Sequence, residues 1–310
     1  MLRKLSKSPS LAASGEGETG SLILSVLVAI CGIFLLDVMG IIIKLLVERY
    51  PTQQLAVFRN IFGLVPCLVL LVLAMRQAPV VYRLPLRLGL LTVLRGGAIT
   101  FAQVCFYLSL MHLAFATAST LAFAGPMFLT ALSVPILGHQ VGHWRWSAVL
   151  IGFVGVVLVM QPNSDIFTWH AVLPLGAAFG YALSSVLVRL FPPSVPTATL
   201  QLYTQLSALA GAVLVLLAGM RVVPVAGLAD WGWLLAMGIC GGCGVLCLIY
   251  AYRRTTPSQI APFEYFGIPI ALVLGWLVFD ENPLDRLLPG VLLIILGGGI
   301  IIWRERRARP

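Results

Sequence analysis

The chain has 310 residues, of which 60% are hydrophobic and only 10% are charged, whereas soluble domains average about 25% charged residues. This composition excludes an ordinary soluble domain and indicates an integral membrane protein. The basic residues behind the net charge of +9 lie mainly in short loops and at the C-terminus, so they follow membrane topology and we predict no nucleic-acid partner.

The chain begins with a polar segment, residues 1–20, that contains no apolar core. A secretory signal peptide needs such a core, so we predict a disordered cytoplasmic tail instead. At the other end, residues 304–310 predict a short basic tail on the same side of the membrane.

Between the two tails, apolar runs predict an all-α integral membrane protein with ten transmembrane helices, because each crossing needs about 20 mainly apolar residues. Most Lys and Arg residues fall on one side of this arrangement, which places both termini in the cytoplasm of a bacterial inner membrane. The predicted spans are 21–46, 53–75, 86–111, 115–136, 146–161, 170–190, 199–219, 231–252, 258–279 and 286–303.

The two halves of the chain resemble each other. Residues 107–126 align with residues 250–269, and both stretches begin with Tyr and end with Pro. This match predicts two repeats of five spans each, residues 21–162 and 163–303. Five is an odd number, so the second repeat enters the membrane from the opposite side, as in the inverted repeats of many transporters. Two such halves can rock against each other and expose a shared midplane site to either side in turn.

Several ionisable residues fall inside the predicted spans, where a charge costs about 2.5–3.5 kcal/mol on insertion scales. Asp37 and Arg95 predict either a polar path along a substrate cavity or a buried ion pair with each other. Arg95 would then contact an anionic group of the substrate, or Asp37, near the midplane. Arg59 lies nearer the surface, and we expect it to extend to the interface, as Lys44 does.

Glu264 lies in the apolar run 260–279, between Pro262 and Pro269. Proline frees backbone carbonyls from the helical hydrogen-bond ladder, so the carboxylate and these carbonyls form a candidate binding wall. We expect Glu264 to bind a cationic group of the substrate or to exchange a proton. A plain hydrogen bond to a neighbouring helix is the alternative.

Prolines and tyrosines supply further candidate residues. Pro126 and Pro269 predict kinks in the fourth and ninth spans that act as gates, although kinks also occur in static helices. Tyr107, Tyr181 and Tyr265 are candidates for stacking on a planar substrate, with simple packing as the alternative role.

The chain lacks the GxxxxGK[ST] phosphate loop, the HExxH zinc motif and the GxSxG nucleophile elbow. We therefore predict no enzymatic activity, no cofactor and no metal site. Cys240, Cys243 and Cys247 form a CxxCxxxC pattern, but no His or acidic residue lies nearby in the sequence, so close helix packing is the favoured role.

Three stretches carry a resemblance to a known family: "LAFATASTLAFAGPMFLTALSVPILG" (113–138), "RWSAVLIGFVGVVLVMQP" (145–162) and "SQIAPFEYFGIPIALVLGWLVFDENP" (258–283). They resemble the drug/metabolite transporter superfamily in its ten-span EamA-type branch. Members of that branch close each repeat with an acidic residue near the span end. Glu281 fits this pattern in the second repeat, whereas His139 stands at this place in the first.

The resemblance implies a secondary transporter of small organic, amino-acid-like metabolites, with export favoured and protons as the candidate coupling ion. An uptake carrier for a vitamin or nucleoside-like metabolite, such as riboflavin or S-adenosylmethionine, is the alternative, because "FRN" (58–60) and "APFEY" (261–265) are similar to such carriers. A structural or sensory membrane protein is the alternative of another class. The expected partners are a small-molecule substrate and the lipid bilayer, around a monomer or homodimer.

Overall fold

The computed structural model describes residues 12–75, 84–138, 143–160, 169–192, 194–219, 221–254, 266–281 and 288–296. Every regular element in these ranges is a helix. The helices are α1 (Ala12–Leu46), α2 (Thr52–Met75), α3 (Leu86–Leu110), α4 (Phe115–Ala122), α5 (Gly125–Leu137), α6 (His143–Met160), η1 (Trp169–Ala171), α7 (Val172–Val188), α8 (Thr197–Gly219), α9 (Leu228–Arg254) and α11 (Gly267–Phe279). Residues 288–296 are also helical.

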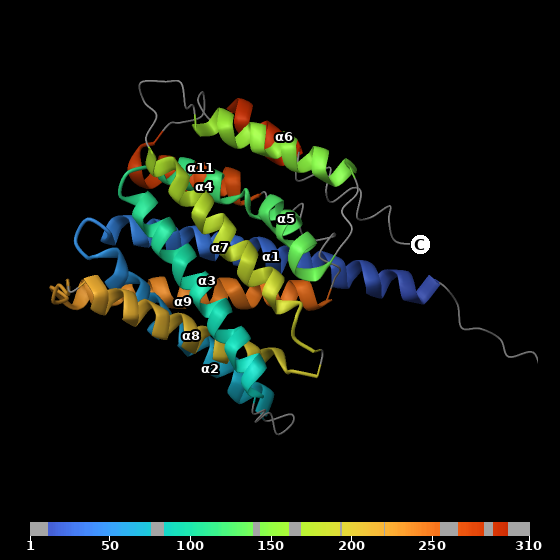
Figure 1. Ribbon diagram of the computed structural model, residues 1–310, viewed down its shortest axis with the longest axis horizontal. Helices are drawn as coiled ribbons and strands as arrows, with labels where there is room; N and C mark the ends of the chain where they lie inside the picture. Colours follow the sequence, from blue (N-terminus) through green and yellow to red (C-terminus); the bar gives the residue numbers. More distant parts are fainter. Residues whose placement is uncertain are drawn as a thin grey trace, which may run out of the picture.

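These helices confirm the predicted all-α membrane fold (Figure 1). Seven of the described spans are long and apolar enough to cross a bilayer, and one of them combines α4 with α5. The apolar parts of α6 and α11 are shorter. The helix at residues 288–296 is described only over these nine residues, because the residues on either side of it lie outside the described ranges. Each of the ten predicted spans therefore contains a helix.

The first helix is longer than the sequence predicts. We expected residues 1–20 to form a tail, but α1 begins at Ala12. Once an apolar span has nucleated a helix, each added residue gains one backbone hydrogen bond, so a flanking segment can continue the helix. The stretch from Ala12 contains Gly15, Gly17 and Gly20, which are poor helix formers, so the extension follows from the apolar span behind it and not from local propensity.

The fourth span is interrupted rather than kinked. Helix α4 ends at Ala122 and α5 begins at Gly125, so Pro126 lies in the first turn of α5. Proline is tolerated there because the first N–H groups of a helix have no intrahelical partner. Pro269 likewise lies in the first turn of α11.

The two halves pack around a common centre in matching pairs. Helix α1 packs against α9 and α3 against α7, which are equivalent pairs when the repeats are exchanged, and α2 packs against its own counterpart, α8. Helices α2 and α8 run antiparallel. Gln53, at the start of α2, lies beside Gly219 at the end of α8, and Gly63 lies beside Gln205. Counterpart helices that run in opposite directions are the mark of an inverted repeat.

Glycines let these helices approach to backbone contact. A Cβ atom at Gly32 of α1 would lie 2.9 Å from the Gly244 carbonyl oxygen of α9, and a Cβ atom at Gly155 of α6 would lie 2.7 Å from the Gly290 carbonyl oxygen. Lipid is as apolar as the helix faces, so helices in a membrane associate through close packing of this kind.

Neighbouring glycines in α3 allow a matched test of this packing. A Cβ atom at Gly96 would lie 2.4 Å from the Cβ atom of Ser207 and 2.7 Å from the backbone nitrogen of Ala208, whereas a Cβ atom at Gly97 would meet no atom within 4 Å. We expect Gly96→Ala to destabilise the protein by about 1–3 kcal/mol through overpacking. Gly97→Ala should be neutral or stabilising by up to about 1 kcal/mol, because Ala favours helix.

Thermal unfolding of the two detergent-purified variants, detected by size-exclusion chromatography after heating, measures the stability change that each substitution causes. Equal melting temperatures for Gly96→Ala and Gly97→Ala would contradict the close α3–α8 contact.

Candidate functional site

Three uncharged amide side chains meet inside the bundle and join the two repeats. Asn60 of α2 donates a hydrogen bond from Nδ2 to Gln103 Oε1 of α3 at 2.9 Å, and Gln205 of α8 donates from Nε2 to Asn60 Oδ1 at 3.1 Å. All three residues are buried. We call Asn60, Gln103 and Gln205 the amide belt. The amide belt was not among the predicted site residues, because an uncharged amide has neither the charge nor the aromatic ring by which a site residue stands out in an apolar span.

Arg59 lies next to the amide belt and is buried, which corrects the expectation that it extends to the interface. Only 7% of the residue is exposed. Its Nη1 donates to Asn60 Oδ1 at 3.2 Å, whereas its Nε has no hydrogen-bond partner in the part of the chain that the structure describes. The two ion pairs among the described residues both involve other side chains. The guanidinium is buried because α2 packs between α8 and α9, and a Cβ atom at Gly241 of α9 would lie 3.1 Å from Arg59 Nε.

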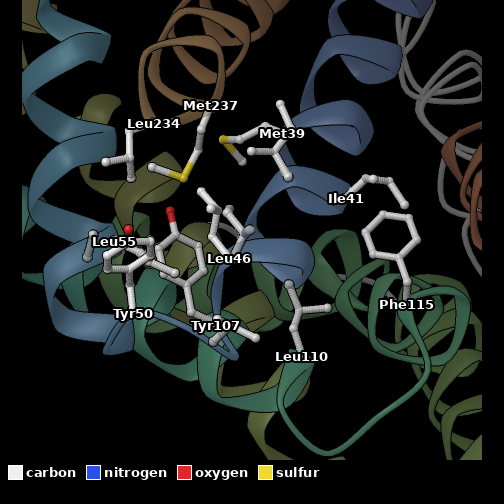
Figure 2. Close-up of a cluster of buried hydrophobic side chains, with 14 of the residues drawn as sticks. Met39, Ile41, Leu46, Tyr50, Leu55, Tyr107, Leu110, Phe115, Leu234 and Met237 are labelled. Atoms are coloured by element: carbon white, nitrogen blue, oxygen red, sulfur yellow. The ribbon is translucent and has the colours of Figure 1, made fainter. Parts of the chain in front are cut away.

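Tyr107 faces the same interior region. Its side chain is fully buried, and its hydroxyl has no hydrogen-bond partner among the described residues. Figure 2 shows this hydroxyl pointing toward Met39 and Met237. The Met39 sulfur lies against the same position, Gly241, as Arg59 Nε. Arg59 and Tyr107 therefore offer free donors on a methionine-lined region, and with the amide belt they form what we call the central site.

Arg95 lies apart from the central site and does not contact Asp37. Its Nη1 donates to Thr204 Oγ1 at 2.6 Å, and its Nε donates to the Ser184 carbonyl at 3.2 Å. These bonds tie α3 to α8 and α7. No ion pair joins Asp37 to Arg95, because the hydrogen bonds of Arg95 direct its guanidinium toward α7 and α8, whereas Asp37 lies on α1. Tyr181 of α7 is 38% exposed.

The sequence predicted that Lys44 extends to the interface. Lys44 instead pairs with Glu281, and this ion pair connects the two repeats. Lys44 also donates to the Leu113 carbonyl at 3.1 Å, and its Nζ lies 4.8 Å from the centre of the Phe279 ring. Glu281 accepts a bond of 3.4 Å from the backbone N–H of Ala116, at the start of α4. The pair joins the end of α1 to the end of α11, positions that are 237 residues apart in the chain.

A cavity of about 410 Å³ opens beside this ion pair, at the end of the bundle where α1 terminates. Its polar lining includes Lys44, Glu48, His112 and Glu281. The ring of His112 also stacks on that of His170 at a centroid distance of 3.7 Å. The cavity is a polar vestibule between elements of both repeats.

Other predicted site residues remain untested by the geometry. Glu264 and Tyr265 lie outside the described residues. Pro126 and Pro269 are placed at helix starts, and this placement leaves their role as gates a prediction. Within the described ranges, no three His, Cys, Asp or Glu side chains gather as metal ligands would.

Comparison with known proteins assigns this architecture to a family. Residues 23–161 and 168–303 each match the profile of the EamA-like transporter family. The chain belongs to the EamA-like transporter family. This membership assigns the two repeats to a transporter of small molecules across a membrane, and not to an enzyme.

Relatives of this transporter differ in direction and cargo. A riboflavin transporter of Vibrio cholerae is 30% identical over 61% of this chain and 63% of its own length. A pseudopaline exporter of Pseudomonas aeruginosa is 28% identical over 87% of this chain and 93% of its own. An S-adenosylmethionine uptake transporter of Rickettsia bellii is 24% identical over 70% of this chain and 73% of its own.

A solved crystal structure supports the fold of this EamA-like transporter. It superposes with a TM-score of 0.65, at 18% sequence identity, over 92% of this chain and 98% of its own. The likeness extends over both repeats.

Proposed function

We propose that this EamA-like transporter moves small metabolites with an anionic group, amino-acid-like compounds among them, across the bacterial inner membrane by alternating access. The observation that carries this proposal is Arg59, a buried guanidinium with no carboxylate partner among the described residues. An unpaired charge in a membrane interior is costly, so such residues face a cavity, a partner or a substrate. A carboxylate or phosphate on the substrate would supply the missing partner.

The neighbours of Arg59 support recognition of a polar molecule. The Tyr107 hydroxyl makes no hydrogen bond to any described residue, so it can donate one to a substrate. The amide belt holds Asn60 in a fixed orientation through helices of both repeats. A substrate bound at this seam contacts both halves, which is what alternating access about a central site requires.

The Lys44–Glu281 ion pair supports a gate at the end of the bundle where α1 terminates. It connects the first repeat to the second, so that end cannot open between α1 and α11 while the pair is intact. We place this end outside the cytoplasm, because most Lys and Arg residues lie at the other end. Glu264 is then the candidate for binding a cationic group of the substrate or exchanging a proton from the cytoplasmic side.

We propose export as the direction, because the match to the pseudopaline exporter covers 87% of this chain, whereas the match to the S-adenosylmethionine uptake transporter covers 70%. Uptake of a planar, vitamin-like molecule is the second candidate. The 30% identity to a riboflavin transporter favours it, and Tyr107 and Tyr181 would then stack on the ring system.

A comparison of metabolites tests the proposed cargo and direction together. Bacterial cells that produce the protein should release more of one or more anionic or zwitterionic metabolites into the medium than cells carrying an empty vector. Cells that produce the Arg59→Leu variant serve as the matched control for membrane load. Accumulation inside the cells would indicate uptake, and a profile confined to purely cationic metabolites would contradict the role of Arg59.

A further inference from the structure

Asp37 is a buried carboxylate that the described side chains leave without a counter-charge. The residue is 8% exposed, and its Oδ2 has no hydrogen-bond partner among the described residues. Lys44, two turns further along α1, pairs with Glu281, and no Lys or Arg side chain in the described ranges lies within ion-pair distance of Asp37. Burying a lone carboxylate is expensive, so this position calls for a positive ligand.

The packing of α1 on α4 shows which groups lie opposite Asp37. A Cβ atom at Gly40 would lie 2.7 Å from the Phe115 ring at the start of α4. One turn beyond Asp37 in the other direction, Ile33 and Phe123 both lie against Gly267. The two helices therefore run antiparallel here, and Asp37 is level with Ser119, halfway between these contacts.

Two hydroxyl groups at this level also lack partners. Ser119 Oγ and Thr120 Oγ1 are buried and make no hydrogen bond among the described residues. A hydroxyl close enough to a carboxylate would donate to it. Asp37 Oδ2, Ser119 Oγ and Thr120 Oγ1 are therefore three buried oxygen atoms at one level of α1 and α4 that lack a partner among the described residues, as they would if they coordinated an ion.

The break between α4 and α5 adds further oxygen donors near this level. Helix α4 ends at Ala122, and Pro126 has no N–H to donate to the Ala122 carbonyl. The C-terminal end of a helix carries a partial negative charge. In transporters with discontinuous helices, such ends and their unwound carbonyls coordinate the coupling ion.

We propose that Asp37, Ser119 and Thr120 bind a monovalent metal cation of the sodium class, at a site separate from the central site. This proposal rests on the proposed transport function, in which the cation would be the coupling ion. A metal cation fits better than a proton, because a proton would neutralise Asp37 but leave the hydroxyl oxygens unpaired. The ion would hold α1 against α4, so its binding depends on the conformation of the first repeat.

Thermal stability of the purified full-length protein in detergent tests the site without any substrate. Intrinsic tryptophan fluorescence gives the melting temperature while Na⁺ replaces choline at constant ionic strength and neutral pH, with K⁺ in a parallel series. We expect Na⁺ to raise the melting temperature in a saturable manner, because a ligand that binds only the folded state stabilises it.

Variants separate this site from general salt effects. Asp37→Asn should abolish the Na⁺-dependent shift, and Ser119→Ala should raise the half-maximal Na⁺ concentration about tenfold, equivalent to the loss of one ligand contact. Asp280→Asn is the matched control, because Asp280 is exposed at the end of α11 and Asn tolerates its left-handed backbone conformation (φ 54°). That control should keep the wild-type response.

The proposal is overturned if the wild-type protein shows no Na⁺-specific shift, or if Asp37→Asn retains it. A melting temperature that responds to pH but not to Na⁺ would assign the site to a proton instead. Should Asp37→Asn fail to fold, an unchanged half-maximal concentration in Ser119→Ala would overturn the site by itself. This experiment measures no transport, so the absence of a Na⁺-dependent shift would not contradict the proposed role of Arg59. Conversely, a failure of the transport proposal would not contradict a measured Na⁺-dependent shift.

Discussion

Replacing Arg59 with Lys should reduce transport of the identified substrate by about 10- to 100-fold, because a hydrogen bond to a charged group contributes about 1.5–3 kcal/mol and each 1.36 kcal/mol is a factor of ten. Lys keeps the positive charge but loses the planar fork that binds a carboxylate with two parallel hydrogen bonds. It also loses the present bond from Nη1 to Asn60 Oδ1. Substrate flux into proteoliposomes, measured at several concentrations, gives the size of the loss.

Arg189→Lys provides the control for this experiment. Arg189 is exposed at the end of α7, so the same substitution there should leave transport near the wild-type level. Size-exclusion chromatography must show that Arg59→Lys is folded. Wild-type flux through a folded Arg59→Lys variant would remove Arg59 from the binding site and with it the main support for an anionic substrate group.

Breaking the Lys44–Glu281 pair should produce the second large effect, on stability and on the transport cycle together. The two side chains are only 17% and 13% exposed, so removing one partner leaves the other charge largely buried. We expect Lys44→Met and Glu281→Gln each to destabilise the protein by about 3 kcal/mol. The double variant should lose less than the sum of the two, with a coupling energy of about 0.5–3 kcal/mol.

A second ion pair of the same chain supplies the comparison. Arg49 pairs with Asp230 at 3.3 Å, but the Arg49 side chain is 68% exposed, so Arg49→Met should cost less than about 1 kcal/mol. Melting temperatures of the five proteins, wild type included, complete the cycle. Strictly additive costs for Lys44→Met and Glu281→Gln would mean that the pair does not hold α1 to α11.

The location of the spans follows from the sequence, because a bilayer leaves so few alternatives. Backbone N–H and C=O groups must be paired inside a membrane, so a long apolar run becomes a helix. The predicted spans 53–75, 86–111 and 199–219 agree with α2, α3 and α8 to within two residues at each end. The five-span repeats also follow from sequence matches, and the paired packing of helices bears them out.

The direction in which each side chain points was decided by the tertiary structure. In a soluble helix, an apolar stripe marks the buried face, but lipid is as apolar as a protein core and erases that contrast. The sequence therefore predicted that Arg59 reaches the interface. In the structure Arg59 is buried, because α2 packs between α8 and α9. The sequence likewise suggested Arg95 as a partner for Asp37. In the structure, Arg95 lies on the face of α3 that contacts Ser184 and Thr204.

The sequence by itself determined that this is a helical membrane protein of two inverted halves, since length, hydropathy and repeat matches are local properties of the chain. Only the tertiary structure revealed the amide belt, the central site and the Lys44–Glu281 pair. Each of these depends on residues from both repeats. Asn60 and Gln205 are 145 positions apart, and Lys44 and Glu281 are 237 apart, so no local pattern could connect them. They meet because glycine-lined helices from the two halves approach closely and fix which faces are shared.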